Sequence, residues 1–174
     1  MKELLVVVDY QKDFVDGSLG FAEAAGLEEA ICQKIRAYRE AGQTVVFTMD
    51  THEEDYLSTQ EGRNLPVEHC IEGTGGWQLY GQVAGLAQEG DRLFCKPTFG
   101  SWELGEYLRQ EGFEKIELCG VVSNICVLSN AVVAKAALPE AQIVVDRRCT
   151  ASNDPQMNQK ALDVLQGLQV QVIG

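Results

Sequence analysis

The segment KIELCGVVSNICVLSN, residues 115–130, decides the fold of this chain. It begins as a run typical of a β-strand, stops at Gly120, crosses a short polar break and continues as an apolar helix that begins near Ser123. A strand followed at once by a helix is half of a strand–helix–strand unit. The break places a single cysteine, Cys126, in the first turn of the predicted helix.

The same alternation of strand and helix continues along the whole chain. Runs rich in β-branched residues are separated by amphipathic segments of helical period, which indicates a parallel sheet covered by helices on both faces. We therefore expect an α/β fold, in which residues 1–174 form a single-domain three-layer α/β/α sandwich with a mainly parallel sheet of about six strands. The predicted strands are LLVVVD, TVVFTMD, DRLFCK, KIELCG, QIVVD and VQVIG, the predicted helices cover 27–41, 76–87, 101–111, 124–137 and 155–167, and a polar insertion occupies about 50–75.

Composition limits the partners and the compartment. With 174 residues and 45% hydrophobic side chains, the chain can bury one sizeable core. A formal charge of -12 disfavours nucleic acid and anionic membrane surfaces. The first apolar run is short and no longer one follows, so we expect neither a signal peptide nor a membrane span. Six cysteines without a CxxC pair fit a reducing, cytoplasmic location, and a homo-oligomer remains open.

Charged residues end most of the predicted strands. Parallel sheets bind ligands beyond the carboxyl ends of their strands, and those ends carry Asp9, Asp50, Lys96 and Asp146. For any one of them the simple explanation is that it is the first position of the strand to reach water. Asp9 and Lys96 together with Cys126 are harder to explain in that way, and they indicate a catalytic site.

The position of Cys126 favours a nucleophile. Unpaired amides and the dipole at a helix start stabilise a thiolate. The two histidines of the chain both lie in the polar insertion, so the base must be sought elsewhere. Asp9 is the candidate acceptor of the thiol proton, and Lys96 is a cation that could lower the thiol pKa and hold Asp9 in place.

Three stretches together resemble the signature motifs of the isochorismatase-like cysteine hydrolases, which include the nicotinamidases: DYQKDF (9–14), KPTFGS (96–101) and GVVSNICV (120–127). The resemblance implies a catalytic triad of Asp9, Lys96 and Cys126. It also implies a cis peptide between Val121 and Val122 and an oxyanion hole formed by the amides of Val122 and Cys126.

The polar insertion carries a second signal. Asp50 and His52 flank one residue, so on an extended segment both side chains point the same way and could bind one ion. Spacing alone leaves open that the histidines simply lie in a flexible surface loop. Similarity to nicotinamidases implies a divalent metal held by Asp50, His52 and His69, which orients the pyridine nitrogen of the substrate. Zinc is expected, with manganese or iron as alternatives.

One further metal ligand and the substrate contacts complete the predicted site. Many family members place a third histidine between the other two ligands, and this chain has none there. We expect Glu61 to replace it in preference to Asp55, because Gly62 follows and could let the backbone turn toward the site. A tryptophan that often precedes the second metal histidine is also replaced, by Leu65 or Pro66. The expected substrate contacts are Phe14, Leu19, Phe99 and Val122.

The resemblance implies an amidohydrolase that converts a small amide, most simply nicotinamide to nicotinate and ammonia, through a Cys126 thioester. The alternatives are another small-amide or carbamoyl hydrolase of the same family, a metal-free isochorismatase, and a catalytically silent binding relative. A signalling receiver domain also combines strand-end aspartates with a lysine. It is disfavoured because Tyr10 stands where a second acid is needed and at least three strand-like runs follow Lys96.

Overall fold

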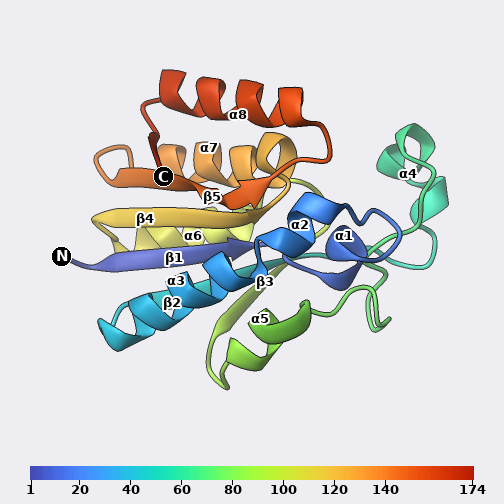
Figure 1. Cartoon of the computed structure of the whole chain (residues 1–174), viewed down its shortest axis with the longest axis horizontal. Coiled ribbons are helices and arrows are strands. Elements are labelled where there is room, and N and C mark those ends of the chain that lie inside the picture. Colours follow the sequence, from blue (N-terminus) through green and yellow to red (C-terminus); the bar gives the residue numbers. More distant parts are fainter.

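Six parallel strands form the centre of the computed structural model, which describes residues 1–174. They are hydrogen-bonded in the order β3-β2-β1-β4-β5-β6 (Figure 1). The predicted parallel sheet is thus confirmed, and every pair in it is parallel. The strands are β1 (Glu3–Val8), β2 (Thr44–Asp50), β3 (Arg92–Lys96), β4 (Lys115–Val121), β5 (Gln142–Ala151) and β6 (Gln171–Ile173).

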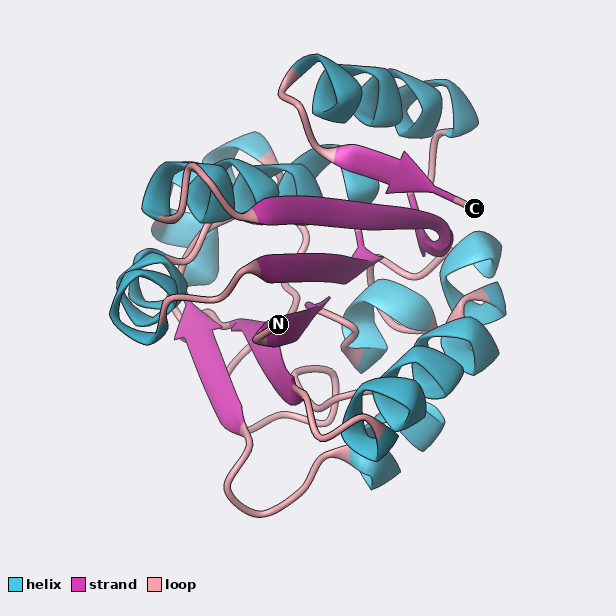
Figure 2. Ribbon diagram, turned by 90° about the vertical axis from the view of Figure 1, so that its left-hand side faces the viewer, coloured by secondary structure: helices cyan, strands magenta, loops and turns pink.

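The central strand β1 shows how the core is divided. Its side chains alternate between the two faces of the sheet, as the pleat requires. Leu5 and Val7 join one buried cluster, whereas Leu4, Val6 and Val8 join the other. Helices cover both faces, which confirms the three-layer sandwich (Figure 2). One face carries α1 (Lys12–Val15), α2 (Ala22–Gly26), α3 (Glu28–Glu40) and α5 (Gly81–Leu86), and the other carries α6 (Trp102–Glu111), α7 (Leu128–Ala137) and α8 (Pro155–Gly167).

Local sequence signals fix the ends of several helices. The hydroxyl of Ser101 accepts a hydrogen bond from the amide of Leu104 at the start of α6, and α6 ends at Gly112, whose φ of 67° suits glycine. Asp154 caps α8 in the same way, with Pro155 as the first helical residue. These boundaries lie within one or two residues of the predicted ones.

Three segments differ from the prediction. The helix expected at 76–87 is shorter, because only Gly81–Leu86 is helical. The helix expected at 124–137 begins with a π-helical turn, Ser123–Val127, which precedes α7. The polar insertion contains a short 3-10 helix, η1 (Tyr56–Ser58), and α4 (Gln60–Asn64). No helix in the chain has both the length and the apolar character that crossing a membrane requires.

The fifth strand is longer than predicted. Asp146 was expected at the end of a strand, but β5 continues to Ala151, with a shift in its register against β4 between Leu118 and Gly120. Asp146 is buried within β5 and forms ion pairs with Lys34 and Arg148. It therefore belongs to a structural charge network and lies outside the site described below.

Candidate active site

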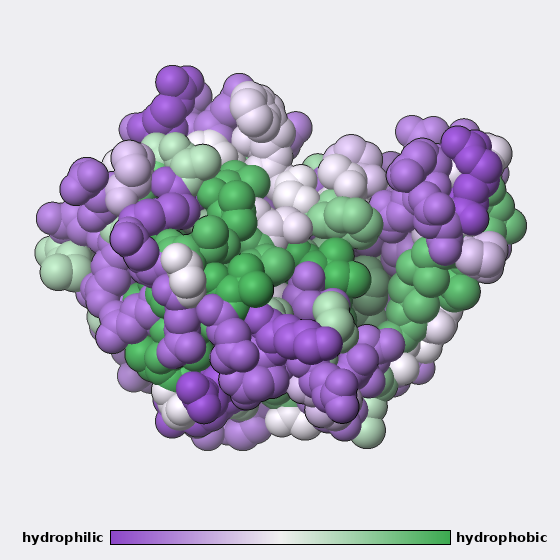
Figure 3. All heavy atoms as spheres, turned by 90° about the horizontal axis from the view of Figure 1, so that it is seen from above, coloured by the Kyte–Doolittle hydropathy of each residue, from purple (hydrophilic) through white to green (hydrophobic).

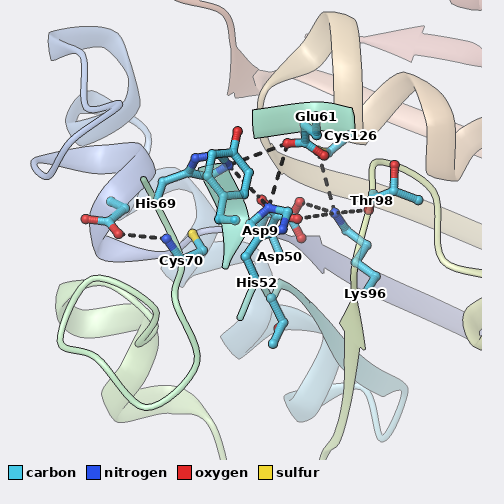
Figure 4. Close-up of polar contacts among 12 residues, drawn as sticks. Asp9, Asp50, His52, Glu61, His69, Cys70, Lys96, Thr98 and Cys126 are labelled. Carbon is cyan, nitrogen blue, oxygen red and sulfur yellow. Dashed lines mark hydrogen bonds and ion pairs between the residues drawn. The ribbon is translucent and has the colours of Figure 1, made fainter. Parts of the chain in front are cut away.

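The strand order brings four distant residues to one edge of the sheet. Lys96 ends β3, Asp50 ends β2, Asp9 follows β1, and Cys126 follows β4 by one turn. These four strands are neighbours in the sheet, and Asp50 lies directly opposite Lys96 in the register of β2 and β3. Figure 4 shows the Lys96 side chain reaching from its strand toward Asp9 and Asp50.

A close backbone contact holds β1 against β4 where the site begins. Gly120 has a φ of +106°, and a Cβ atom there would lie 2.0 Å from the carbonyl oxygen of Val8. No other residue fits this position without moving the strand. Asp9, the residue after β1, has a φ of 46°, an uncommon conformation that turns the chain out of the strand.

Asp9, Lys96 and Cys126 form one contact group. The Nζ atom of Lys96 lies 2.6 Å from Oδ2 of Asp9 and 3.6 Å from Sγ of Cys126, and it donates to the carbonyl of Thr98 at 3.0 Å. The hydroxyl of Thr48 donates to Oδ1 of Asp9 at 2.6 Å. Asp9 and Lys96 are almost completely buried. The three residues predicted as a triad therefore meet in the structure.

Burial sets the protonation preferences of this group. Burial raises the pKa of the Cys126 thiol well above its usual range, Asp9 and Asp50 raise it further, and Lys96 opposes them. Burial alone would lower the pKa of Lys96, but Asp9, Cys126 and Asp50 raise it. The helix start predicted a stabilised thiolate, and burial acts against that form here. Burial also raises the pKa of Asp9, and Lys96 opposes this effect.

A second group of side chains lies next to the first. Asp50, His52, Glu61 and His69 each offer one donor atom, and these atoms lie within 4.8 Å of one another. Oδ2 of Asp50 is 3.1 Å from Nε2 of His52 and 3.3 Å from Nε2 of His69. Oε1 of Glu61 is 3.7 Å from both of these nitrogens.

The two histidines meet because the polar insertion returns to its starting point. The amide of His52 donates to the carbonyl of Cys70 at 3.0 Å, and His52 forms a parallel bridge with Ile71. The amide of Cys70 in turn donates to a carboxylate oxygen of Asp13 in α1 at 2.8 Å. This backbone pairing places His69 beside His52.

The chemistry of the second group fits a divalent cation. Nδ1 of His69 donates to the carbonyl of Val67 at 2.8 Å, which leaves the lone pair of Nε2 directed at the other donors. The ring of Tyr56 packs against both imidazoles, with centroids 4.7 Å from His52 and 4.9 Å from His69. Although burial opposes it, bonds to His52 and His69 hold the pKa of Asp50 well below its usual range. An ionised carboxylate and two oriented imidazoles are suitable ligands.

Glu61, and not Asp55, joins this group. Asp55 is exposed and immediately precedes η1. Glu61 comes from α4, where the Thr59 hydroxyl accepts from the amide of Gly62 at 3.0 Å. Gly62 lies within α4, so it does not provide the turn toward the site that the sequence suggested. It allows close packing instead, since a Cβ atom there would lie 2.0 Å from the carbonyl oxygen of Tyr56.

A cavity of about 530 Å³ opens beside both groups, and its walls include His52, Glu61, Lys96, Thr98 and Phe99. Its lining is mostly polar, with acidic residues from the insertion. Figure 3, a view from above, shows hydrophilic and hydrophobic surface side by side over the projecting right-hand end of the molecule, where the segment with α4 lies in Figure 1. The cavity is large enough for a small organic amide.

The expected substrate contacts are distributed around this region. Phe99 lines the cavity and is 43% exposed. Phe14 is buried in the core with its ring 5.5 Å from that of His69, and Leu19 packs against the same core. The peptide between Val121 and Val122 is cis, as the resemblance implied. Phe14, Leu19 and Val122 do not line the cavity.

Two buried polar residues near the site escaped the sequence analysis. Thr48 binds Asp9 from within β2, and Gln11 accepts from the amide of Asp50 at 2.8 Å while donating to the carbonyl of Asp50 at 2.9 Å. Both are fully buried. The available signal was a polar residue in an otherwise apolar strand, as in VVFTMD. Such a residue needs a buried hydrogen-bond partner.

The chain is similar to known proteins over most of its length. The isochorismatase domain model matches residues 3–174. An isochorismatase family protein, PncA, from Bacillus subtilis (strain 168) is 34% identical over 163 residues, which cover 87% of each chain. A crystal structure of nicotinamidase PncA from Bacillus subtilis superposes with a TM-score of 0.89 and 29% identity over 100% of both chains. The pyrazinamidase of Pyrococcus horikoshii in complex with zinc gives a TM-score of 0.87 and 25% identity over 99% of both chains.

Proposed function

Because the chain belongs to the isochorismatase family, we propose that it is a nicotinamidase, which hydrolyses nicotinamide to nicotinate and ammonia through a thioester on Cys126. One observation carries this proposal. The carboxylate of Asp50 connects the two groups of the site, with Oδ1 3.7 Å from Nζ of Lys96 and Oδ2 bonded to His52. Lys96, which contacts Cys126, and His52 and Glu61 of the candidate metal centre therefore line the same cavity.

This pairing suits a substrate with two polar ends. Nicotinamide carries a ring nitrogen at one end and a carboxamide at the other. Asp50, His52, Glu61 and His69 would hold the cation, for which zinc is our choice because a similar structure contains it. The bound ion would supply a Lewis acid for the ring nitrogen and so orient the substrate. An isochorismatase proper would not require such a donor set.

The first half of the reaction uses the triad. Asp9 accepts the thiol proton of Cys126 as Sγ attacks the amide carbon, so the C–S bond forms as the C=O bond opens. Lys96 contacts both partners and balances the charge that passes between them. When the tetrahedral adduct collapses, the C–N bond breaks and Asp9 returns the proton to the leaving nitrogen. The products are ammonia and a thioester on Cys126.

The second half restores the thiol. Asp9 accepts a proton from water, whose oxygen attacks the thioester carbon. The C–S bond then breaks to release the acid, and Asp9 returns the proton to Sγ, which regenerates the Cys126 thiol. We propose that the amides of Val122 and Cys126 stabilise the oxyanion in both halves. The backbone supports this role for Val122, because the amides of Ile125 and Val127 both donate to its carbonyl, whereas its own N–H has no acceptor in the protein.

The test is ammonia release from a matched panel of amides. Nicotinamide should be the best substrate, and benzamide, which has the same shape but no ring nitrogen, should be much poorer. A chelator should abolish the difference between them, and added zinc should restore it. If an N-carbamoyl amino acid is hydrolysed and nicotinamide is not, the protein is a carbamoyl hydrolase of the same family and the proposal is wrong.

A further inference from the structure

Asn130 is a fully buried polar residue near the start of α7, four positions after Cys126. Its Nδ2 atom donates to the carbonyl of Cys126 at 2.8 Å and to the carbonyl of Phe99 at 3.1 Å. Its Oδ1 atom accepts from the amide of Ser101 at 2.9 Å. One side chain thus binds the nucleophile's own backbone and two residues of another segment.

That segment, residues 97–101, connects β3 to α6 and forms part of the cavity wall. It begins directly after Lys96, whose Nζ atom donates to the carbonyl of Thr98. The segment lies close against α7, since a Cβ atom at Gly100 would be 3.3 Å from a methyl group of Val133. Its position therefore depends on contacts with α7 as well as with Lys96.

Together these contacts form a closed ring. It runs from the carbonyl of Cys126 through Asn130 to Phe99, along the backbone to Thr98, and through Lys96 back to Sγ of Cys126. We propose that Asn130 is a positioning residue that fixes the Cys126 turn against segment 97–101 and so sets the placement of Lys96 beside the nucleophile. The inference deepens the proposed function and, as a statement about catalysis, rests on it.

The chemistry of the side chain explains why asparagine stands here. Only a carboxamide of this length offers two N–H donors and an acceptor at one position. Threonine in a helix can return a hydrogen bond to the carbonyl four residues earlier, which here is that of Cys126, but it cannot also reach two groups of segment 97–101. Aspartate has nearly the same shape, yet it lacks both donors and would direct an oxygen at two carbonyls.

Two variants separate the roles of these hydrogen bonds. Asn130→Thr keeps a bond to Cys126 and removes both bonds to segment 97–101, whereas Asn130→Asp removes both donated bonds. We expect each to lower kcat on nicotinamide by at least about tenfold, because misplacement by about 1 Å costs up to about 10²-fold. KM should change little, since Asn130 contacts none of the candidate metal donors. The pH profile of Cys126 alkylation by iodoacetamide should shift upward as Lys96 loses its fixed position.

Controls distinguish positioning from stability. Leu165→Ala in α8 removes a fully buried side chain remote from segment 97–101, and it provides a protein with a lowered Tm and an unaltered alkylation profile. Asn158→Asp keeps the acceptor for the Ser123 hydroxyl, which lies 2.6 Å away, and should behave as wild type. If Asn130→Asp fails to fold, Asn130→Thr alone still tests whether the bonds to segment 97–101 are needed.

The inference is overturned if Asn130→Thr keeps wild-type kcat, because the bonds to segment 97–101 would then be dispensable. It is also overturned if the Asn130 variants and Leu165→Ala, compared at equal loss of Tm, have the same kcat and the same alkylation profile. A rise in KM with unchanged kcat would assign Asn130 to shaping the pocket and would equally contradict it. Should the wild-type protein hydrolyse no amide, the proposed function fails, but the alkylation profiles still test whether Asn130 positions Lys96 against Cys126.

Discussion

Asp50 and Lys96 face each other at the ends of β2 and β3, with Oδ1 of the carboxylate 3.7 Å from Nζ of the ammonium group. The other oxygen of Asp50 lies against both histidines. One carboxylate therefore belongs both to the contact group of the nucleophile and to the candidate metal centre. The predictions below treat the two groups separately, so that each can fail without the other.

Cys126 should be the only cysteine whose modification stops the reaction. Cys95 is the one exposed cysteine and should also react with iodoacetamide. Loss of activity should follow labelling of Cys126, as measured by peptide mass spectrometry, and nicotinamide should protect. Cys95→Ser should be inactivated at the wild-type rate. If activity instead follows the labelling of Cys95, the assignment of the nucleophile is wrong.

Asp9→Asn should lower turnover by at least about 10²-fold, the lower range of what general acid–base catalysis contributes. Asparagine preserves the shape of the side chain and can still accept from the Thr48 hydroxyl, so the loss reports on proton transfer. Turnover is measured as initial ammonia release. Asp16→Asn, which changes an exposed carboxylate directly after α1, is the matched control. Full activity in Asp9→Asn would remove this residue from the proton-transfer role.

Lys96→Met should raise the pKa of the Cys126 thiol. Burial, Asp9 and Asp50 already raise this pKa, and Lys96 is the neighbour that lowers it, so loss of the ammonium group removes the opposing effect. The measurement is the pH dependence of the alkylation rate of Cys126. Lys160→Met, which removes an exposed lysine from α8, should leave the profile unchanged. An unchanged profile in Lys96→Met would exclude this lysine from tuning the thiol.

Glu61→Gln should weaken binding of a divalent cation by at least about tenfold, because it removes one charged donor from the group of four. Asp55→Asn should bind as wild type, since Asp55 is exposed and lies outside the donor group. Affinity is measured by competition with a chelating dye, and metal content by elemental analysis. The reverse result, loss in Asp55→Asn and retention in Glu61→Gln, would contradict our choice of ligand.

Asp146→Asn should reduce stability in a pH-dependent way. Burial would raise the pKa of Asp146, but Arg148 and Lys34 lower it below its usual range. The stabilisation is therefore present above the unfolded pKa of about 3.9 and is lost as the pH falls through the folded pKa. Breaking a buried pair of this kind costs about 3 kcal/mol at pH 7.

Urea denaturation at pH 7 and below pH 4 checks this prediction. The difference in the free energy of unfolding between wild type and Asp146→Asn should shrink at the lower pH. Asp163→Asn changes an exposed carboxylate of α8 and should stay within about 0.5 kcal/mol of wild type at both values. A difference for Asp146→Asn that is independent of pH would mean that the ion pairs contribute no net stability.

Much of the site could be predicted because parallel strands end at one edge. Once β1, β2, β3 and β4 are recognised, Asp9, Asp50, Lys96 and Cys126 must lie at that edge, whatever the details of the loops. The end of the fifth strand was misjudged because QIVVD already reads as a complete strand. Its continuation to Ala151 depends on a register shift, which has no sequence pattern of its own.

The details that escaped prediction involve hydrogen bonds between distant segments. The π-helical turn before α7 differs from an α-helix only in which carbonyl each amide reaches, and its residues have ordinary helical propensities. In the sequence, Asn130 is a polar residue in a mainly apolar helix. Its role is visible only from its hydrogen bond to the carbonyl of Phe99, about thirty positions away. Patterns of spacing within one element cannot show such partners.

The polar insertion projects beyond the layers of the sandwich and yet returns to pair with His52 (Figure 1). It supplies Glu61 and His69, whereas Asp9 and Lys96 stand at the ends of strands and Cys126 lies in the turn after β4. The candidate nucleophile group and two of the four candidate metal donors are thus supplied by separate parts of the chain. If the proposed roles hold, we expect that exchanging residues 53–69 for another excursion of similar length would change the substrate preference and leave Asp9, Lys96 and Cys126 in place, which makes this segment the natural place to redirect the protein by design.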